Sequence, residues 1–328
     1  ANRFRLVPAD AKGALMTATI VPPTPDILAR AADILRIGGL VAMPTETVYG
    51  LACDAANPDA VAGLYEAKGR PRFNPLIAHV ASQAMAEREA VFTPLARKAA
   101  ESFWPGPLTI VLPVAPTASV CDLARAGLDT VALRRPVHPV AQALLDAFGG
   151  PLVAPSANKS GHVSPTTPAH VRTDLADRVS LILDGGPCAI GIESTIVDFT
   201  GNTPVLLRAG ALETEELENC LGVALARPDD RTGITAPGQL KSHYAPRATL
   251  RLNAATPMSG EGYLGFGDHC PREGNLSPKG DLAEAAANLF AMLRDLDMRY
   301  ERIAVAPIPH TGLGEAINDR LERAAHRD

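Results

Sequence analysis

The residues best suited to chemistry are three cations in one short loop. Lys68, Arg70 and Arg72 occur in the segment KGRPRFNP, residues 68–75, which joins an expected helix to an apolar run. Arginine forks and a lysine ammonium bind phosphate oxygens well, and the prolines lower the cost of ordering the loop. A solvated loop that carries charge for solubility fits the same residues equally well. His79 follows in the apolar run, where a histidine satisfied within the core is the more common case.

Further polar segments follow, precede or close apolar runs. They are MPTETVYG at residues 43–50, APSANKSG at 154–161, GIEST at 191–195, and the arginines Arg134 and Arg208 at the ends of their runs. Ligands of α/β proteins bind outside strand ends, where hydroxyls, amides and backbone N–H groups suit phosphate or carboxylate groups. Each segment alone is nearly as well explained as a polar turn. Together they predict one pocket in which these two arginines meet Lys68 and Arg70.

Several common catalytic and metal-binding signatures are missing from the sequence. It has no GxxxxGK[ST] or GxGxxG loop, no GxSxG elbow and no HExxH motif, and GLG at residues 312–314 predicts a turn that starts a helix. The five cysteines, at positions 53, 121, 188, 220 and 270, show no CxxC or CxxH spacing, so we expect neither zinc nor disulfides. Scattered thiols fit a reducing cytosol, and we expect a cytoplasmic protein.

Apolar periodicity indicates the elements that must position these residues. Helical patterns are expected at residues 26–37, with Thr24 or Asp26 as cap, and at 58–67, 96–103, 140–148, 168–176, 282–296 and from 315. Short apolar runs predict strands at residues 40–43, 76–80, 108–114, 130–133, 152–154, 181–183, 195–199, 205–207, 249–252, 263–266 and 303–306. Alternating strands and helices predict an α/β fold, and connections too short for a parallel crossover predict a mixed sheet.

Length and local composition predict the domain organisation. The chain has 328 residues, which at about 150 residues per domain suggests two domains. Residues 225–247 are rich in Pro and Gly and show no apolar period, which predicts a linker. We therefore expect an N-terminal extension at 1–24, a large domain at 25–224, this linker at 225–247, and a small α/β domain at 248–328.

Composition also excludes several classes of protein. Hydrophobic residues make up 46% of the chain and charged residues 20%, which rules out disorder of the whole chain. The net charge of −5 argues against a nucleic-acid coat, and the 4% of aromatic residues argues against a base-stacking single-strand binder. No apolar run reaches the ~18–20 residues that cross a bilayer, so we expect no membrane partner.

Five motifs in order resemble the YrdC family. They are PTETVYGL, KGRPRFNPL with His79, the Ser-x-Asn of APSANKSG, GIESTIVD, and the LLRAG that follows it. The linker segment SHYAP, residues 242–246, and the small terminal domain resemble the two-domain branch of this family, the L-threonylcarbamoyladenylate synthases. The resemblance covers roughly residues 25–250 and continues more weakly to the end of the chain.

The resemblance implies a fold and a reaction. The family fold is a twisted α/β sheet with a concave, positively charged cavity, and the terminal domain is Rossmann-like. The implied reaction joins L-threonine, bicarbonate or CO₂, and ATP into threonylcarbamoyl-AMP with release of pyrophosphate, and Mg²⁺ accompanies ATP. The product would pass to a complex that transfers the threonylcarbamoyl group to tRNA, with at most weak direct tRNA binding by this chain.

The resemblance also assigns roles to residues by motif. Around threonine it places Thr47, His79, Arg134 and Ser194. Around ATP it places Lys68, Arg70, Asn74, Ser156, Asn158, Ser164, Arg208 and Tyr244, the last from a linker that folds over the nucleotide. Lys68 and Arg70 would be the catalytic residues, because fixed cations stabilise the charge that builds on the phosphates.

Two other classes of function stay open. An RNA-binding module with a basic concave surface and no catalysis would use the KGRPR loop, although the acidic balance and the few aromatic residues weigh against it. A carbamoyl-transfer enzyme of the hydrogenase-maturation kind shares the YrdC-like unit. That family also carries zinc-finger cysteines, and their spacing is absent from this sequence.

Overall fold

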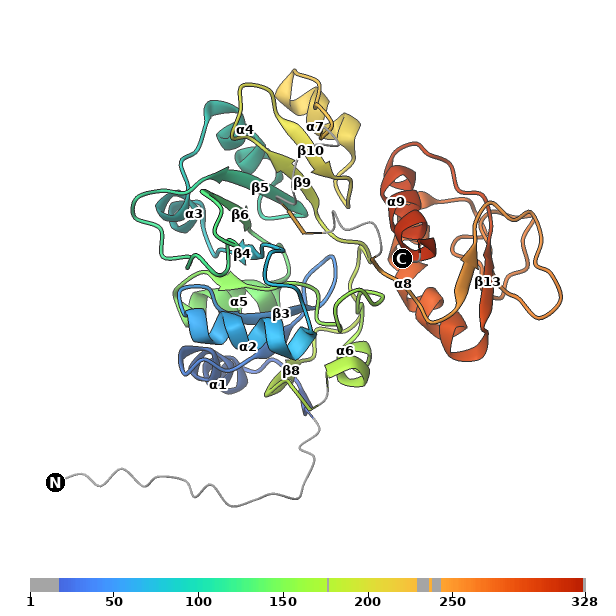
Figure 1. The fold of residues 1–328 in the computed structure, drawn as a ribbon, viewed down its shortest axis with the longest axis horizontal. Coiled ribbons are helices and arrows are strands. Elements are labelled where there is room, and N and C mark those ends of the chain that lie inside the picture. Colours follow the sequence, from blue (N-terminus) through green and yellow to red (C-terminus); the bar gives the residue numbers. More distant parts are fainter. Residues whose placement is uncertain (1–17, 176, 229–235, 238–242, 327–328) are drawn as a thin grey trace, which may run out of the picture.

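The computed structural model describes residues 18–175, 177–228, 236–237 and 243–326 (Figure 1). Much of the expected linker, Ser242 of the SHYAP segment included, lies outside the described residues, as does most of the expected N-terminal extension. Within the described residues the chain forms a large α/β body and a smaller one beside it (Figure 1).

A mixed sheet runs through the large body. Its strands are β1 (Ile20–Val21), β2 (Val41–Met43), β3 (Gly50–Asp54), β4 (Ile77–His79), β5 (Leu108–Pro113), β6 (Thr130–Arg134), β7 (Leu152–Val153), β8 (Leu181–Leu183), β9 (Thr195–Asp198) and β10 (Val205–Arg208). Their order in the sheet is β1-β8-β2-β3-β7-β4-β6-β5-β9-β10. The sheet contains parallel pairs, such as β4 with β6, and antiparallel pairs, such as β5 with β6. The predicted α/β class and mixed sheet are confirmed.

The helices of the large body begin at positions that the sequence marks clearly. They are α1 (Pro25–Arg36), α2 (Pro58–Lys68), α3 (Gln83–Glu89), α4 (Pro94–Phe103), α5 (Pro139–Phe148), α6 (Pro168–Leu175) and α7 (Thr214–Leu221). Proline suits the first helical position because the N–H that it lacks has no partner there. Thr24, one of the two expected caps of α1, accepts a hydrogen bond from Ile27 N at 3.4 Å. α2 ends at Gly69, whose left-handed φ of +61° turns the chain into the basic loop.

Some elements carry no clear signal in the sequence. β1 lies inside the expected N-terminal extension and pairs in parallel with β8, so this stretch contributes to the sheet. It has only 2 residues, which is too short to show a period. β3 begins at Gly50, the last residue of the PTETVYG segment, and is buried along nearly its whole length. A strand that is buried on both faces does not alternate apolar with polar residues.

The smaller body contains three parallel strands and two helices. β11 (Thr249–Arg251), β12 (Gly262–Leu264) and β13 (Arg302–Val305) lie in the order β11-β13-β12. α8 (Leu282–Arg299) connects β12 to β13, and α9 (Leu313–Ala325) follows β13. α9 begins directly after Gly312, as the GLG fragment predicts. Both helices lie on the side of the small sheet that faces the large body (Figure 1).

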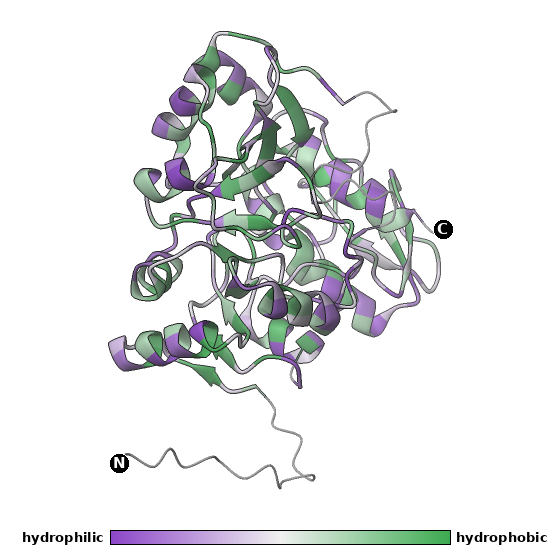
Figure 2. Cartoon of the chain, turned by 60° about the vertical axis from the view of Figure 1, so that its left-hand side comes forward, coloured by the Kyte–Doolittle hydropathy of each residue, from purple (hydrophilic) through white to green (hydrophobic). Residues whose placement is uncertain are grey.

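Two large apolar cores and one small buried cluster hold the fold together. Figure 2 shows hydrophobic residues along the strands and mixed hydropathy on the helices that cover them. One buried cluster fills the large body. The second fills the small body and also takes in Val48, Val163, Ile192 and Tyr244, which come from loops of the large body and from the linker. The two bodies therefore share part of one core. In the part of the chain that is described, no helix combines the length and the apolar character needed to cross a membrane.

Candidate active site

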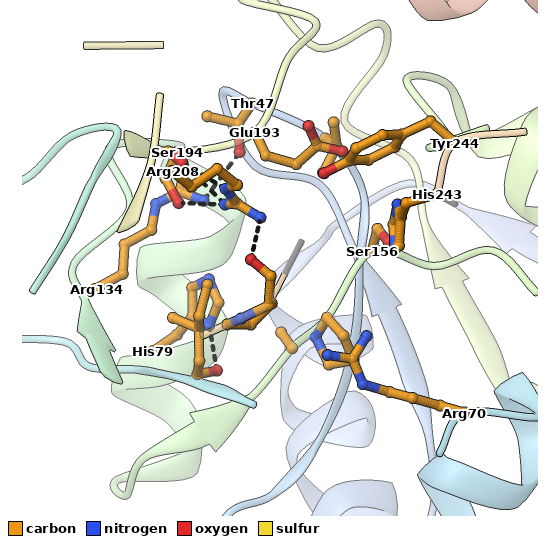
Figure 3. Close-up of a pocket in the computed structure, with 15 residues that line it drawn as sticks. Thr47, Arg70, His79, Arg134, Ser156, Glu193, Ser194, Arg208, His243 and Tyr244 are labelled. Atoms are coloured by element: carbon orange, nitrogen blue, oxygen red, sulfur yellow. Dashed lines mark hydrogen bonds between the residues drawn. The ribbon is translucent and has the colours of Figure 1, made fainter. Parts of the chain in front are cut away.

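One pocket lies where strand ends and loops of the large sheet meet the linker (Figure 3). Its lining residues are Thr47, Val48, Arg70, Ile77, His79, Arg134, Ala154, Pro155, Ser156, Glu193, Ser194, Arg208, Pro237, His243 and Tyr244. The volume of the cavity is about 50 Å³, which is room for a few water molecules.

The register of the strands explains how residues far apart in the sequence meet here. His79 at the end of β4 pairs with Arg134 at the end of β6, and Arg134 pairs with Thr109 of β5. Thr109 in turn pairs with Ile196 of β9, two residues after Ser194. The pocket therefore lies along one line that crosses four neighbouring strands.

Arg134 is held by hydrogen bonds on three sides. Its Nη1 donates to Thr47 Oγ1 at 2.9 Å, its Nη2 to Glu46 Oε1 at 2.6 Å, and its Nε to the Gly106 carbonyl at 3.3 Å. The Arg134 and Glu46 side chains are both buried. A buried guanidinium with this many partners has little freedom to turn, so its remaining N–H groups present a fixed donor pattern.

His79 lies beside Arg134 on the pocket wall (Figure 3). Its Nδ1 is 3.2 Å from the Ile77 carbonyl. Burial, followed by the charge of Arg134, lowers the pKa of His79 to about 3, so the ring is neutral at neutral pH. A neutral imidazole adds a polar contact to the pocket without adding another positive charge.

Ser194 and Arg208 form a second network. Ser194 Oγ lies 2.8 Å from Thr109 Oγ1 and accepts a hydrogen bond from Arg208 Nη2 at 3.1 Å. The same guanidinium donates to the Ser194 carbonyl from Nη2 at 2.9 Å and from Nε at 3.1 Å. Arg208 also reaches the Pro237 carbonyl of the linker at 3.4 Å. This network connects the sheet, the GIEST segment and the linker.

Lys68 does not line the pocket, although the motif assigns it to ATP. Its ammonium donates to the Ser156 carbonyl and, at 2.5 Å, to the Asn158 carbonyl. Burial, followed by the charge of Arg70, lowers the pKa of Lys68 well below its ordinary value. Lys68 thus holds the loop after β7 in place, with its charge close to the pocket.

Arg70 is the cation of the basic loop that reaches the pocket. Its guanidinium donates to the Pro75 carbonyl at 3.1 Å and to the Asn74 carbonyl at 3.4 Å, so the loop closes around its own side chain. Burial lowers the pKa of Arg70 to about 10, and the side chain stays charged at neutral pH. Asn74 Oδ1 is buried and has no hydrogen-bond partner within the described residues.

Most of the residues that the motifs single out lie together. Those that line the pocket are Thr47, Arg70, His79, Arg134, Ser156, Ser194, Arg208 and Tyr244. The others do not line it: Lys68, Asn74, Asn158 and Ser164. Lys68, Asn74 and Ser164 nevertheless hydrogen-bond to lining residues, so they support the wall of the pocket.

Sequence reasoning missed two acidic residues, Glu46 and Glu193, and two residues of later segments: His243, which lines the pocket, and Arg320, which bonds to Glu193. Glu193 accepts a hydrogen bond from Ser164 Oγ at 2.5 Å and one from Arg320 Nε of α9 at 2.9 Å. Burial by itself would raise the pKa of Glu193, but Arg320 and Arg208 outweigh it and lower that pKa. Glu46 and Glu193 stand inside motifs that the sequence singles out, as does His243, whereas nothing in the sequence marks Arg320.

Aromatic contacts fix the described end of the linker in the pocket. The Tyr244 ring stacks on Phe290 of α8 with centroids 5.6 Å apart, and His243 packs edge-on against it at 4.0 Å. The guanidinium carbon of Arg320 lies 5.4 Å from the centroid of the Tyr244 ring. Burial, followed by the charges of Arg70 and Lys68, lowers the pKa of His243 well below its ordinary value. Within the described residues, no group of three or more His, Cys, Asp or Glu side chains could hold a metal ion.

Two family profiles match adjoining parts of the chain. The family described as "Telomere recombination", which groups Sua5, YciO and YrdC sequences, matches residues 33–210. The family described as "Threonylcarbamoyl-AMP synthase, C-terminal domain" matches residues 212–326.

Curated relatives and a solved structure resemble nearly the whole chain. A threonylcarbamoyl-AMP synthase of Bacillus subtilis is 40% identical over 91% of this chain and 92% of its own. One of Pyrococcus abyssi is 40% identical over 90% of this chain and 93% of its own. The crystal structure of P. abyssi Sua5 complexed with L-threonine has a TM-score of 0.82 and 38% identity, and covers 91% of this chain and 94% of that one.

Proposed function

Because the chain belongs to the Sua5/YrdC family, with the C-terminal domain of threonylcarbamoyl-AMP synthases, we propose that it makes L-threonylcarbamoyl-AMP. Its substrates are L-threonine, bicarbonate or CO₂, and ATP, and its second product is pyrophosphate. The observation that carries the proposal is the pocket itself. Residues from distant motifs, among them Thr47, Arg134 and Arg208, line one cavity in a protein that resembles a threonine-bound Sua5.

The chemistry needs positioned charges more than it needs a nucleophilic side chain. The threonine nitrogen forms a bond to the carbon of CO₂ and loses a proton, which gives a carbamate. A carbamate oxygen then bonds to the α-phosphorus of ATP while the bond to pyrophosphate breaks. Neither step requires a covalent enzyme intermediate, and positioning can supply up to about 7–11 kcal/mol of such a barrier.

We divide the residues between the two substrates by motif, and Arg208 lies at the boundary because it bonds to Ser194. We assign threonine to the side formed by Thr47, His79, Arg134 and Ser194, where a fixed guanidinium suits its carboxylate. We assign the phosphates of ATP to the side of Arg70, Ser156 and Arg208, with Lys68, Asn74, Asn158, Ser164 and Tyr244 supporting that side. Arg70 and Lys68 stabilise the charge that develops as pyrophosphate leaves.

Mg²⁺ enters this proposal as the companion of ATP. The phosphate oxygens of ATP and water molecules would provide most of its ligands. Bound there, Mg²⁺ would neutralise part of the charge of the phosphates. We expect chelation of Mg²⁺ to abolish activity.

The linker acts as a lid over the nucleotide. Sites for small molecules and cofactors usually measure about 300–1,000 Å³, whereas this cavity measures about 50 Å³. Pro237, His243 and Tyr244 take up the space on its linker side. We infer that ATP enters when these residues move aside, and that their return excludes the water that would hydrolyse a carbamate or a mixed anhydride.

The alternative function as an RNA-binding module fits the pocket less well. The cations that would hold an RNA backbone are nearly inaccessible: the exposed fractions are 2% for Lys68, 8% for Arg70 and 4% for Arg134. A strand of RNA needs phosphate contacts on an open surface. We therefore propose that the chain is a cytoplasmic enzyme. Its product would be used by a separate complex, which transfers the threonylcarbamoyl group to tRNA.

Release of pyrophosphate tests the proposal. Purified protein with Mg²⁺, ATP, bicarbonate and L-threonine should release pyrophosphate, and omission of any one substrate should stop the release. The measurement is a coupled pyrophosphatase assay, with the adenylate product identified by mass spectrometry. Release of pyrophosphate without threonine would contradict the proposal.

A further inference from the structure

We propose that Glu46 is a positioning residue for threonine binding, because it fixes the orientation of the Arg134 guanidinium. Glu46 does not line the pocket, so it acts through neighbours that do. The inference rests on the proposed function, which assigns the threonine carboxylate to the side of the pocket formed by Thr47 and Arg134.

The carboxylate of Glu46 is fixed at both oxygens. Oε1 accepts from Arg134 Nη2 at 2.6 Å, and Oε2 accepts from the backbone N–H of Val137 at 3.2 Å. The side chains of Glu46 and Arg134 are only 7% and 5% exposed, so water does not compete for these bonds. Arg134 is the last residue of β6 and Val137 follows it in the connection to α5, so the carboxylate holds the end of β6 and the segment after it.

The backbone of Glu46 makes a third connection. Its carbonyl accepts from the N–H of Ile190 at 2.8 Å, shortly before Glu193 and Ser194 enter the pocket. Thr47, the next residue, holds Nη1 of Arg134. Glu46 thus ties together the loop after β2, the end of β6 and the segment that leads into β9, which are three walls of the same pocket.

The contacts of Arg134 determine which of its N–H groups remain for a ligand. A guanidinium has five N–H groups, and the contacts described above use one each on Nε, Nη1 and Nη2. One N–H on each terminal nitrogen is left to present to a ligand. Two N–H groups on the terminal nitrogens of a guanidinium can donate to the two oxygens of a carboxylate. Glu46 and Thr47 together set the direction in which that pair points.

Glu46→Gln tests the inference with little change in volume. Glutamine keeps one acceptor oxygen and replaces the other by an amide NH₂, which cannot accept from Val137 N–H. We expect the KM for threonine to rise on the order of ten- to a hundredfold, since a small misplacement of a binding group has effects of that size. The KM for ATP and the kcat at saturating threonine should change by less than about twofold, because Arg70 and Arg208 are untouched.

Glu89→Gln is the matched control. Glu89 is also a buried carboxylate that joins a helix to a loop, since it accepts from Ser119 N at 2.7 Å and from Val120 N at 3.0 Å. It does not line the pocket. We expect this variant to lower the Tm while the KM for threonine stays unchanged. Equal increases in that KM in both variants would mean that loss of stability is the cause, and would overturn the inference.

Two further variants separate positioning from folding. Glu46→Asp keeps the charge on a shorter side chain and should give a threonine KM between those of the wild type and Glu46→Gln. Arg134→Gln should raise the threonine KM, and adding Glu46→Gln to it should raise the KM no further, because Glu46 acts through Arg134. The inference would be contradicted if the increase in the threonine KM of the double variant equalled the product of the increases in the two single variants.

The same series distinguishes this inference from the proposed function. A threonine KM that rises in Arg134→Gln but not in Glu46→Gln would overturn the role of Glu46 alone. An unchanged threonine KM in Arg134→Gln would overturn the assignment of threonine to this side of the pocket, and with it the role of Glu46.

Discussion

At the scale of single residues, the basic loop divides its cations between the pocket and the surface. Arg70 points into the pocket, whereas Arg72, two residues later, is exposed. Gly69 produces this difference, because its left-handed φ starts a turn in which Arg70 N–H donates to the Tyr65 carbonyl at 2.9 Å. Arg70 also bonds to carbonyls of its own loop, so its direction is set locally.

Replacement of Arg70 tests the role of this loop. We expect Arg70→Ala to lower kcat/KM for ATP by a factor on the order of a hundred or more, since it removes a fixed positive charge beside the phosphates. Arg72→Ala removes an exposed arginine from the same loop and should leave kcat/KM within about twofold of the wild type. The measurement is pyrophosphate release, with circular dichroism to confirm the fold. Near wild-type turnover in Arg70→Ala would remove the loop from the site.

At the scale of elements, α9 brings the small domain into contact with the pocket. Arg320 on this helix is 1% exposed and bonds to Glu193, to the Ala209 carbonyl at 2.7 Å and to Asp319 at 2.8 Å. Burial by itself would lower the pKa of Arg320, but Tyr244 and the two carboxylates outweigh it and raise that pKa. The helix therefore positions one wall of the pocket from outside the large sheet.

Loss of Arg320 should affect stability and activity together. Arg320→Gln leaves the buried carboxylate of Glu193 without its charged partner, which typically costs about 3–5 kcal/mol of unfolding free energy. Turnover should fall as well, because Glu193 and Tyr244 both line the pocket. Arg323→Gln, one turn along the same helix, breaks a partly exposed pair with Asp319 and should cost less than about 1 kcal/mol. Urea denaturation and pyrophosphate release measure both effects, and equal losses in the two variants would contradict the role of Arg320.

At the scale of the whole molecule, the two bodies are closely joined. Arg294 of α8 pairs with Asp174 of α6 at 2.6 Å, and Thr214 of α7 donates to Glu315 of α9 at 2.8 Å. Gly191 lies so close to α8 that a Cβ on it would stand 2.5 Å from the Ala286 carbonyl. Its φ of +81° is a second reason why this position of the GIEST motif is a glycine. These contacts join the large body and the small body around the pocket.

Stability of the whole molecule should depend on pH through its buried histidines. Burial lowers the pKa of His79 to about 3 and that of His170 to about 4, and it lowers the pKa of His243 as well. The unfolded chain binds these protons near pH 6.5, so it is favoured as the pH falls below that value. We expect the unfolding free energy to be highest above pH 7 and to fall between pH 6.5 and 4.5, by up to about 1.4 kcal/mol per pH unit for each proton.

Urea denaturation at several pH values measures this dependence. His79→Gln should flatten the slope between pH 6.5 and 4.5, because it removes one of the groups that take up a proton on unfolding. His269→Gln changes an exposed histidine and should leave the slope as it is. A wild-type unfolding free energy that stays constant from pH 7.5 to 4.5 would show that these histidines are not neutral in the folded protein.

Sequence patterns were sufficient for most of the elements and for most of the pocket. Capping residues, prolines and apolar runs are local signals, and they placed α1, α2 and most of the strands within a few residues. The motifs predicted Thr47, Arg70, Arg134 and Arg208 because polar residues at strand ends show in the sequence itself. The missed elements, such as β1 and β3, are either too short to show a period or buried on both faces.

Only the tertiary structure decided which side chains face the pocket and what pairs with them. Lys68 and Arg70 are two residues apart and both bond to loop carbonyls, yet only Arg70 lines the cavity. Glu46 and Arg320 reach the site through Arg134 and Glu193, contacts that join residues 88 and 127 positions apart. Composition and spacing report which charges a chain carries, but the neighbours that fix or neutralise each charge depend on how strands and domains pack.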